Sequence, residues 1–293
     1  MKTNRREFIQ QAGLLSAGLI IKPAAFLPRM HRNVGLQLYT IREQIAKDVP
    51  GVIAKVAQAG YTNVEPNGYI RKDKFWGMDA KAFRAILDAN NLVTTSGLYG
   101  IDIGGEKDLD DLKHFADVAN ILGEKYVVIP WIFEEYRKTA DDYKILADKM
   151  NKAGEATKAV GVHLGYHNHN FEFTDMGGGQ NGYELLLNNT DPALVKMEMD
   201  IYWIVRGGAD PVELFKQHPG RFSLLHVKDM DKTNRELTTE VGAGTIDFKN
   251  IFAHAKLAGV DYAFVEQESF AIDWYASITQ SANYLKNELL TIH

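Results

Sequence analysis

The chain has 293 residues and no cysteine, which excludes disulfides, thiolate metal ligands and cysteine nucleophiles. Apolar residues make up 45% and charged residues 24%, as in ordinary globular proteins, which excludes a disordered or fibrous chain. Beyond the first 33 residues, 27 basic residues stand against 37 acidic ones, a net charge of -10. A body this acidic does not favour binding to polyanions, so we expect no nucleic-acid partner.

The first 32 residues have the layout of an export signal. Arg5 and Arg6 precede a short apolar segment, residues 12–21, and small residues near a cleavage site follow at Pro23–Ala25. The apolar segment is too short to span a bilayer, which takes about 20 residues. Because the paired arginines resemble a twin-arginine signal, we predict that residues 1–32 are a twin-arginine-type signal peptide and linker. The protein would then be exported to the periplasm, with no stable membrane span after processing; an ordinary secretory signal or an uncleaved anchor is the alternative.

Short apolar runs alternate with amphipathic segments through the rest of the chain. In residues 49–57, for example, the apolar side chains fall on one face of a helix. Several such segments end in a glycine just before the next apolar run, which is typical of a helix C-terminus: Gly60, Gly123, Gly161 and Gly259. The expected strands are Val34–Tyr39, Thr62–Pro66, Val93–Leu98, Tyr126–Pro130, His163–His167, Val195–Asp200, Phe222–Val227 and Ala263–Glu266.

Strands that alternate with helices predict a parallel α/β sheet with crossover helices. Eight such units over about 250 residues match a (β/α)₈ TIM barrel. A doubly wound open sheet is the alternative, but residues 40–42 after the first strand contain no glycine-rich turn. Because no linker divides the body, we predict a single domain over residues 33–293.

Ionisable residues follow the last four predicted strands, at the end where barrels of this kind carry their active sites. Because side chains alternate along a strand, each strand contributes a pair on one face. These pairs are His167 with His169, Glu198 with Asp200, His226 with Lys228, and Glu266 with Glu268. Imidazole and carboxylate donors together suit Mn²⁺, Zn²⁺, Co²⁺ or Fe²⁺. We predict that one divalent metal ion binds to His167, Asp200, His226 and Glu266, with Glu198 deeper in the barrel and Glu268 as the alternative to Glu266.

These residues, in this order, resemble the xylose isomerase-like family of barrel enzymes, which includes sugar epimerases and inosose dehydratase. The resemblance covers the whole body of the chain. Asp200, His226 and Glu266 fall on three of the family's four metal-binding positions, and His167 stands where the family's epimerases carry glutamate. The other matching pieces are residues 34–39, 60–65, 202–203, 226–229 and 242–247.

The resemblance implies a metal-dependent isomerase or epimerase that removes a proton next to a metal-bound carbonyl of a keto-sugar. In the epimerases of this family, two glutamates face each other across the sugar and each moves a proton. His167 in place of one of them argues against that symmetrical mechanism here. The alternative is therefore a lyase or dehydratase acting by β-elimination on an inosose or a 3-keto-glycoside. A non-catalytic sugar-binding barrel is a second alternative. An exported enzyme is expected to meet unphosphorylated sugars, and a homodimer is a family-level expectation.

The candidate base or acid is His169, because the ordinary pKa of imidazole lies near neutrality. Glu65, at the end of the second strand, competes for that role. Lys228 is expected to hold a sugar hydroxyl or to stabilise a developing oxyanion. The residues expected to contact the sugar are Tyr39, Trp131, Trp203 and Glu172.

Overall fold

The computed structural model of this protein describes residues 31–70, 72, 74–105 and 108–292. The predicted signal peptide lies outside these residues, apart from its last two positions, so the expected export and the domain boundary stay predictions. Within the described ranges, no helix is both long enough and apolar enough to cross a membrane.

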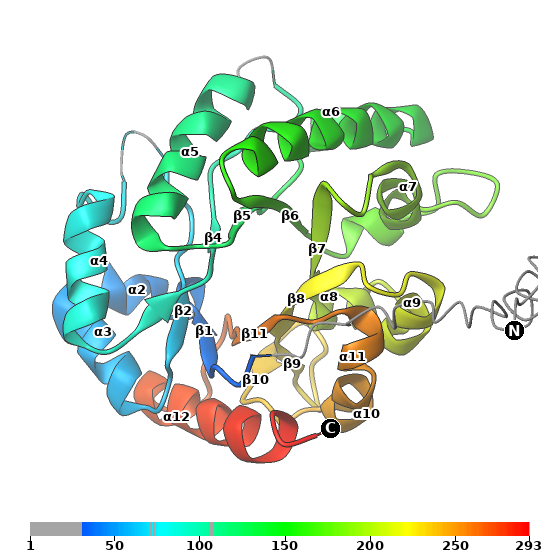
Figure 1. Ribbon diagram of the computed structural model, residues 1–293. Helices are drawn as coiled ribbons and strands as arrows, with labels where there is room; N and C mark the ends of the chain where they lie inside the picture. The colour runs from blue at the N-terminus through cyan, green and yellow to red at the C-terminus, as the bar shows by residue number, and fades with distance from the viewer. Residues whose placement is uncertain (1–30, 71, 73, 106–107, 293) are drawn as a thin grey trace, which may run out of the picture.

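Parallel strands close into a barrel, seen along its axis in Figure 1. The strands are β1 (Gly35–Gln37), β2 (Asn63–Glu65), β3 (Val93–Thr94), β4 (Ser96–Leu98), β5 (Tyr126–Ile129), β6 (His163–His167), β7 (Val195–Asp200), β8 (Phe222–Val227) and β11 (Tyr262–Val265). The predicted third strand is interrupted at Thr95: β3 pairs with β2, and β4 pairs with β5. Counted as one strand, this pair completes the eight strand positions, and the predicted TIM barrel is confirmed.

Helices surround the sheet on its outer face (Figure 1). They are α2 (Arg42–Ile45), α3 (Val49–Gln58), α4 (Ala80–Ala89), α5 (Asp108–Leu122), α6 (Ala140–Ala159), α7 (Gly182–Asn189), α8 (Ile201–Arg206), α9 (Pro211–Gln217), α10 (Phe248–Ala253), α11 (Ala255–Ala258) and α12 (Trp274–Tyr284), which continues into the π-helical η4 (Leu285–Leu289). Short 3₁₀ turns are η1 (Leu38–Ile41), η2 (Glu134–Tyr136) and η3 (Phe171–Phe173). Gly259 ends α11 in the left-handed conformation, with φ of 83°, as its position before a strand predicts.

The barrel has two separate apolar cores. The larger core lies between the sheet and the helices. The smaller core fills the inside of the barrel with side chains that point inward from the strands, namely Leu98, Tyr126, Val128, Leu224, Tyr262 and Phe264. On β8 the inward-pointing Leu224 comes two residues before His226. The polar residues at the carboxyl ends of the strands therefore lie directly above the smaller apolar core.

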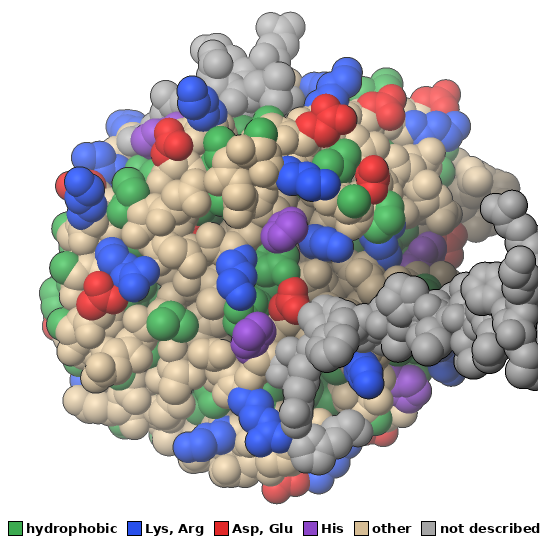
Figure 2. All heavy atoms as spheres, in the orientation of Figure 1, with side chains coloured by type: hydrophobic (Ala, Val, Ile, Leu, Met, Phe, Trp, Pro, Cys, Tyr) green, Lys and Arg blue, Asp and Glu red, His purple; other side chains and the backbone are tan. Residues whose placement is uncertain are grey.

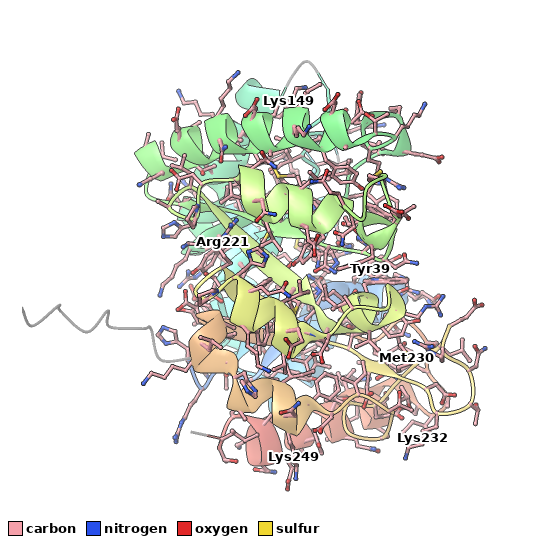
Figure 3. The ribbon with its side chains drawn as sticks, turned by 90° about the vertical axis from the view of Figure 1, so that its right-hand side faces the viewer. Tyr39, Lys149, Arg221, Met230, Lys232 and Lys249 are labelled. Carbon is pink, nitrogen blue, oxygen red and sulfur yellow. The ribbon has the colours of Figure 1, made fainter. Side chains whose placement is uncertain are left out.

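The carboxyl ends of the strands gather at one end of the barrel. Figure 3 shows Tyr39 and Met230 toward this end and Arg221, just before β8, on the opposite side. An antiparallel pair, β9 (Asp229–Met230) with β10 (Thr238–Thr239), extends the chain beyond β8 at the same end. On the face shown in Figure 2, Lys and Arg side chains lie among Asp and Glu side chains, without a large patch of one sign.

Glu124, just before β5, is a buried carboxyl group with hydrogen-bonding neighbours. Its oxygens accept hydrogen bonds from the hydroxyl groups of Tyr99 and Thr94. Burial raises the pKa of Glu124 to about 8. The folded protein therefore keeps this proton at pH values where the unfolded chain, with an ordinary glutamate pKa of 4.5, has lost it.

This difference predicts a pH-dependent stability. Between pH 4.5 and 8 the folded state binds one more proton at Glu124 than the unfolded state, so the free energy of unfolding falls as pH rises, by about 1.4 kcal/mol per pH unit. Glu124→Gln should remove this part of the slope, because an amide can accept from Tyr99 and donate to Thr94 without titrating. Urea unfolding at pH 5, 6.5 and 8 measures how the free energy of unfolding changes with pH in the two proteins. Exposed Glu155→Gln is the control, and an unchanged slope in Glu124→Gln would contradict the assignment.

Candidate active site

Four side chains from neighbouring strands converge at the carboxyl end of the barrel. His167 and Asp200 end β6 and β7, His226 lies in β8, and Glu266 follows β11 directly. Their ligand atoms lie within 4.8 Å of one another, and all four residues are buried. In the sheet register Asp200 stands beside His226, which accounts for part of this convergence. The structure thus brings together the four residues predicted as metal ligands.

Asp200 carries a carboxylate oxygen without a hydrogen-bond partner. Its Oδ1 accepts a hydrogen bond from the backbone N–H of Trp203 at 3.0 Å and caps α8. Its Oδ2 is buried and unpartnered, and Lys228 Nζ lies 3.7 Å away. Burial raises the pKa of Asp200 to about 7, although Lys228 opposes the shift. Because an unpartnered buried carboxylate is costly, this oxygen fits a cation-binding position.

His226 lies between two carboxylates. Its Nδ1 is 2.8 Å from Glu266 Oε2 and its Nε2 is 2.6 Å from Glu65 Oε2. Burial opposes protonation, but the carboxylates of Glu198, Glu65 and Glu266 together raise the pKa of His226 well above its usual value. With a cation bound, Nδ1 is the nitrogen that faces the cluster, and the Nε2–H can donate to Glu65. A carboxylate in that position fixes the tautomer and the ring orientation of a metal-binding histidine.

Glu198 lies one layer deeper, as predicted. Its Oε2 is 3.3 Å from His167 Nδ1 and 3.4 Å from His226 Nε2, and neither of its oxygens has a hydrogen-bond partner. Burial, and then the nearby Glu65, raise its pKa well above the usual value. Glu198, Glu65 and His226 form a second close group beneath the first.

A cavity of about 400 Å³ opens directly above the cluster. Its wall contains the predicted Tyr39, Trp131 and Trp203, and also His169 and Lys228. Tyr39 and Trp131 keep 36% and 39% of their surface exposed, so their rings are available to a ligand. The remaining lining residues are Asn67, Leu98, Pro130, His167, Asn170, Glu266 and Glu268.

His169 is enclosed by aromatic rings. Its imidazole stacks on Phe171 at 5.5 Å, with Trp131 at 4.6 Å and Trp203 at 5.6 Å between ring centroids. Burial, and then the charge of Lys228, lower the pKa of His169 to about 3. Its Nδ1 has no hydrogen-bond partner. The side chain is therefore a neutral imidazole on the cavity wall, but burial makes it a weaker base than the near-neutral imidazole on which its predicted role was based.

Glu65 and Glu172 occupy positions that do not match their predicted roles. Neither lines the cavity, and both are fully buried. Glu65 accepts from Gln37 Nε2 at 2.8 Å and pairs with His226, so it contacts that imidazole from below and stays apart from the cavity. Glu172 accepts hydrogen bonds from the Tyr166 hydroxyl and from the backbone N–H of His169, and therefore supports the turn that carries His169. Strand-end position alone did not reveal these partners.

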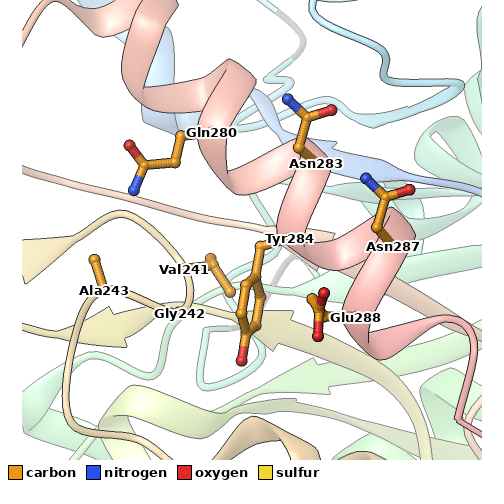
Figure 4. A pocket seen from close by; sticks show the side chains of 8 residues that line it. All are labelled: Val241, Gly242, Ala243, Gln280, Asn283, Tyr284, Asn287 and Glu288. Atoms are coloured by element: carbon orange, nitrogen blue, oxygen red, sulfur yellow. The ribbon is translucent and has the colours of Figure 1, made fainter.

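A second hollow, of about 330 Å³, lies on the outside of the barrel (Figure 4). Residues of α12 and η4 face residues 241–243 across it. Among its lining residues are Gln280, Asn283, Tyr284 and Asn287, and none belongs to the histidine–carboxylate cluster. The candidate active site is therefore the cavity at the end of the barrel.

Comparison with known proteins agrees with this architecture. A sequence model described as the xylose isomerase-like TIM barrel matches residues 53–288. The chain belongs to this family. It is similar to the inosose dehydratase of Geobacillus kaustophilus, with 25% identity over 258 residues that cover 73% of this chain and 80% of that protein. The inosose dehydratase of Lacticaseibacillus casei is also 25% identical, over 74% of this chain and 80% of its own length.

Two solved structures superpose on most of the chain. A sugar phosphate isomerase/epimerase from Parabacteroides distasonis is 29% identical, with a TM-score of 0.78 over 89% of this chain and 99% of that one. A 3-keto-D-glucoside 4-epimerase from E. coli is 15% identical, with a TM-score of 0.63 over 88% of this chain and 99% of that one, and shares the fold. The predicted family and fold are confirmed.

If His167, Asp200, His226 and Glu266 are the donor set of a metal site, Asp200→Asn should weaken binding of a divalent ion by roughly 100-fold or more. This loss exceeds the one typical of a residue that only holds a metal ligand in place. Asparagine keeps the oxygen that caps α8 but replaces the unpartnered Oδ2. Calorimetric titration with Mn²⁺ or Zn²⁺ measures the affinity. Asp210→Asn changes the equivalent cap of α9 and should bind the metal like the wild type. Equal affinity in Asp200→Asn would refute the site.

Glu65 allows a separate prediction, because it touches the ligand His226 without lining the cavity. Glu65→Gln should weaken metal binding by about 10- to 100-fold while the thermal unfolding midpoint stays near the wild-type value. The control is Glu213→Gln, an exposed position in α9. A Glu65→Gln variant that binds Mn²⁺ as tightly as the wild type would show that Glu65 does not orient His226.

Proposed function

We propose that this protein is a divalent-metal-dependent enzyme that moves a proton beside the carbonyl of a keto-sugar or a related cyclic polyol ketone. The observation that carries this proposal is the buried cluster of two imidazoles and two carboxylates at the floor of an aromatic-walled cavity. The similarity to inosose dehydratases and to a sugar phosphate isomerase/epimerase supports the same class of chemistry.

The cluster residues fit a divalent cation, which His167, Asp200, His226 and Glu266 would hold. Such a cation supplies Lewis acidity, which makes the C–H next to a carbonyl more acidic. Two carboxylates balance the charge of one divalent ion. The two imidazoles add donors without adding negative charge.

The cavity wall supplies the remaining functions. The rings of Tyr39, Trp131 and Trp203 can pack against the apolar face of a sugar. His169, held neutral, accepts the proton from carbon. Lys228 can donate an N–H to a sugar oxygen while its charge stays balanced by neighbouring carboxylates. If the proton returns to carbon, the product is an isomer or an epimer; if it goes to a departing oxygen, the product results from elimination.

We favour elimination, the reaction of a dehydratase or lyase. Epimerisation inverts a carbon and needs groups that move protons on both faces of the sugar. Here His167 supplies a nitrogen donor at the β6 position, and Glu266 is bound to His226. His169 is left as the proton-transfer group on one wall. The similarity to inosose dehydratases points in the same direction.

The reaction is tested by incubating the Mn²⁺-loaded protein with an inosose and with a 3-keto-glucoside in D₂O. Loss of water or release of the aglycone shows elimination. Deuterium at the carbon next to the carbonyl, without bond cleavage, shows isomerisation or epimerisation. If neither substrate reacts but both bind, the protein is a sugar-binding barrel and the proposal fails.

His169→Ala should lower the turnover of the reacting substrate by about 10²- to 10⁴-fold, the usual contribution of a general acid–base group. Metal content should stay unchanged, since His169 lies outside the donor set. The matched control is His163→Ala, which removes an exposed histidine from the start of the same strand. Wild-type turnover in His169→Ala would assign the proton transfer to another group.

A further inference from the structure

One cation lines the cavity among the residues that the structure describes, and it is surrounded by carboxylates. Lys228 is 1% exposed. Its Nζ contacts Glu268 Oε1 and lies 3.7 Å from Asp200 Oδ2 and 3.8 Å from Glu266 Oε1. Asp200 and Glu266 belong to the donor set, so a bound metal ion would share their charge. Glu268 is then the carboxylate that remains to neutralise Lys228.

Glu268 is held in place by its backbone. Its N–H donates to Thr238 Oγ1 at 2.9 Å, and its carbonyl accepts from Arg42 Nη2 at 3.3 Å. The next residue, Ser269, donates its own N–H to the same Thr238 oxygen at 3.0 Å. The loop after β11 is thus tied to β10, and the Glu268 side chain, 38% exposed, stands at the cavity edge beside Lys228.

Two arginines lie near the cavity mouth, and each packs its guanidinium against an aromatic ring. The Arg42 guanidinium lies 4.4 Å from the centre of the Tyr39 ring and donates to the Tyr39 carbonyl. The Arg137 guanidinium lies 3.6 Å from the Phe171 ring centre, and its Nε donates to the Ile132 carbonyl. Neither lines the cavity. A phosphate group is usually bound by free arginine or lysine N–H groups, and no described lining residue offers an uncompensated cation.

We propose that Glu268 is a specificity-determining residue: by neutralising Lys228 it restricts the cavity to uncharged sugars and disfavours phosphorylated or carboxylated ones. The inference rests on the proposed function, because it names the substrate class of the same site. Lys228 keeps its N–H groups for neutral oxygens of a sugar. An anionic substrate would either have to displace the Glu268 carboxylate from the buried Lys228 ammonium group or bind close to that carboxylate, where the two negative charges repel each other.

The test is a titration of the Mn²⁺-loaded protein with D-fructose and with D-fructose 6-phosphate, followed by tryptophan fluorescence, since Trp131 and Trp203 line the cavity. The wild type should bind fructose about tenfold or more tightly than the phosphate ester. In Glu268→Gln the affinity for the ester should rise by about tenfold or more, with a change below about threefold for fructose.

The matched control is Glu236→Gln. It removes the same charge from an exposed side chain that pairs with Arg206 and does not contact Lys228. Unchanged circular dichroism and unfolding midpoints establish that both variants fold. The proposal is overturned if the wild type binds the ester as well as fructose, if Glu268→Gln gains no affinity for it, or if Glu236→Gln gains as much.

If the wild type does not bind fructose, this result counts against the proposed function and not against the role of Glu268. Binding of inorganic phosphate then tests the Lys228–Glu268 ion pair by itself. Phosphate binding by Glu268→Gln, lost again in the Lys228→Gln, Glu268→Gln double variant, supports the role of Glu268. No phosphate binding by Glu268→Gln overturns it.

Discussion

The balance of charge inside the barrel governs this structure. Four buried carboxyl groups lie in two close groups that share His226, above the apolar interior of the barrel: Asp200 and Glu266 in the upper group, and Glu65 and Glu198 in the lower. The cations that contact them among the described residues are His226 and Lys228. Buried charges cost several kcal/mol each unless they are paired. The unpartnered oxygens of Asp200 and Glu198 show that protein groups alone do not complete the pairing.

A divalent cation at the upper cluster would relieve this imbalance, and the choice of donors is consistent with it. Asp200 and Glu266 offer two negative charges, equal to the charge of one such ion, and His167 adds a neutral nitrogen. The lower layer then has a different task. Glu65 accepts from His226 and Gln37. It does not line the cavity, but it would set the orientation of the His226 ring toward a bound cation.

The cavity above this cluster combines aromatic walls with polar groups whose charges are compensated. His169 is neutral because it is buried among rings and lies near Lys228. Lys228 keeps its proton because carboxylates surround it, although burial opposes the charge. Such a wall offers hydrogen bonds and flat apolar surfaces, as a neutral sugar requires, and offers little to an anionic one. The interior charge balance therefore bears on metal binding, on the proton-accepting form of His169 and on substrate choice together.

Local patterns in the sequence determined the strand positions, the barrel fold and the four residues of the upper cluster. They did so because the alternation of side chains along a strand, and the residue at which a strand ends, can be read from a short segment. The same patterns could not place Glu65, Glu172 or Glu268. The roles of Glu65 and Glu268 depend on partners from distant parts of the chain. Glu65 pairs with His226, 161 positions away, and Glu268 pairs with Lys228, 40 positions away. Glu172 is placed by a turn that folds its carboxylate under His169. Closure of the barrel decided these contacts, because a carboxylate acts according to the charge and the solvent that the folded chain brings to it, and sequence spacing records neither.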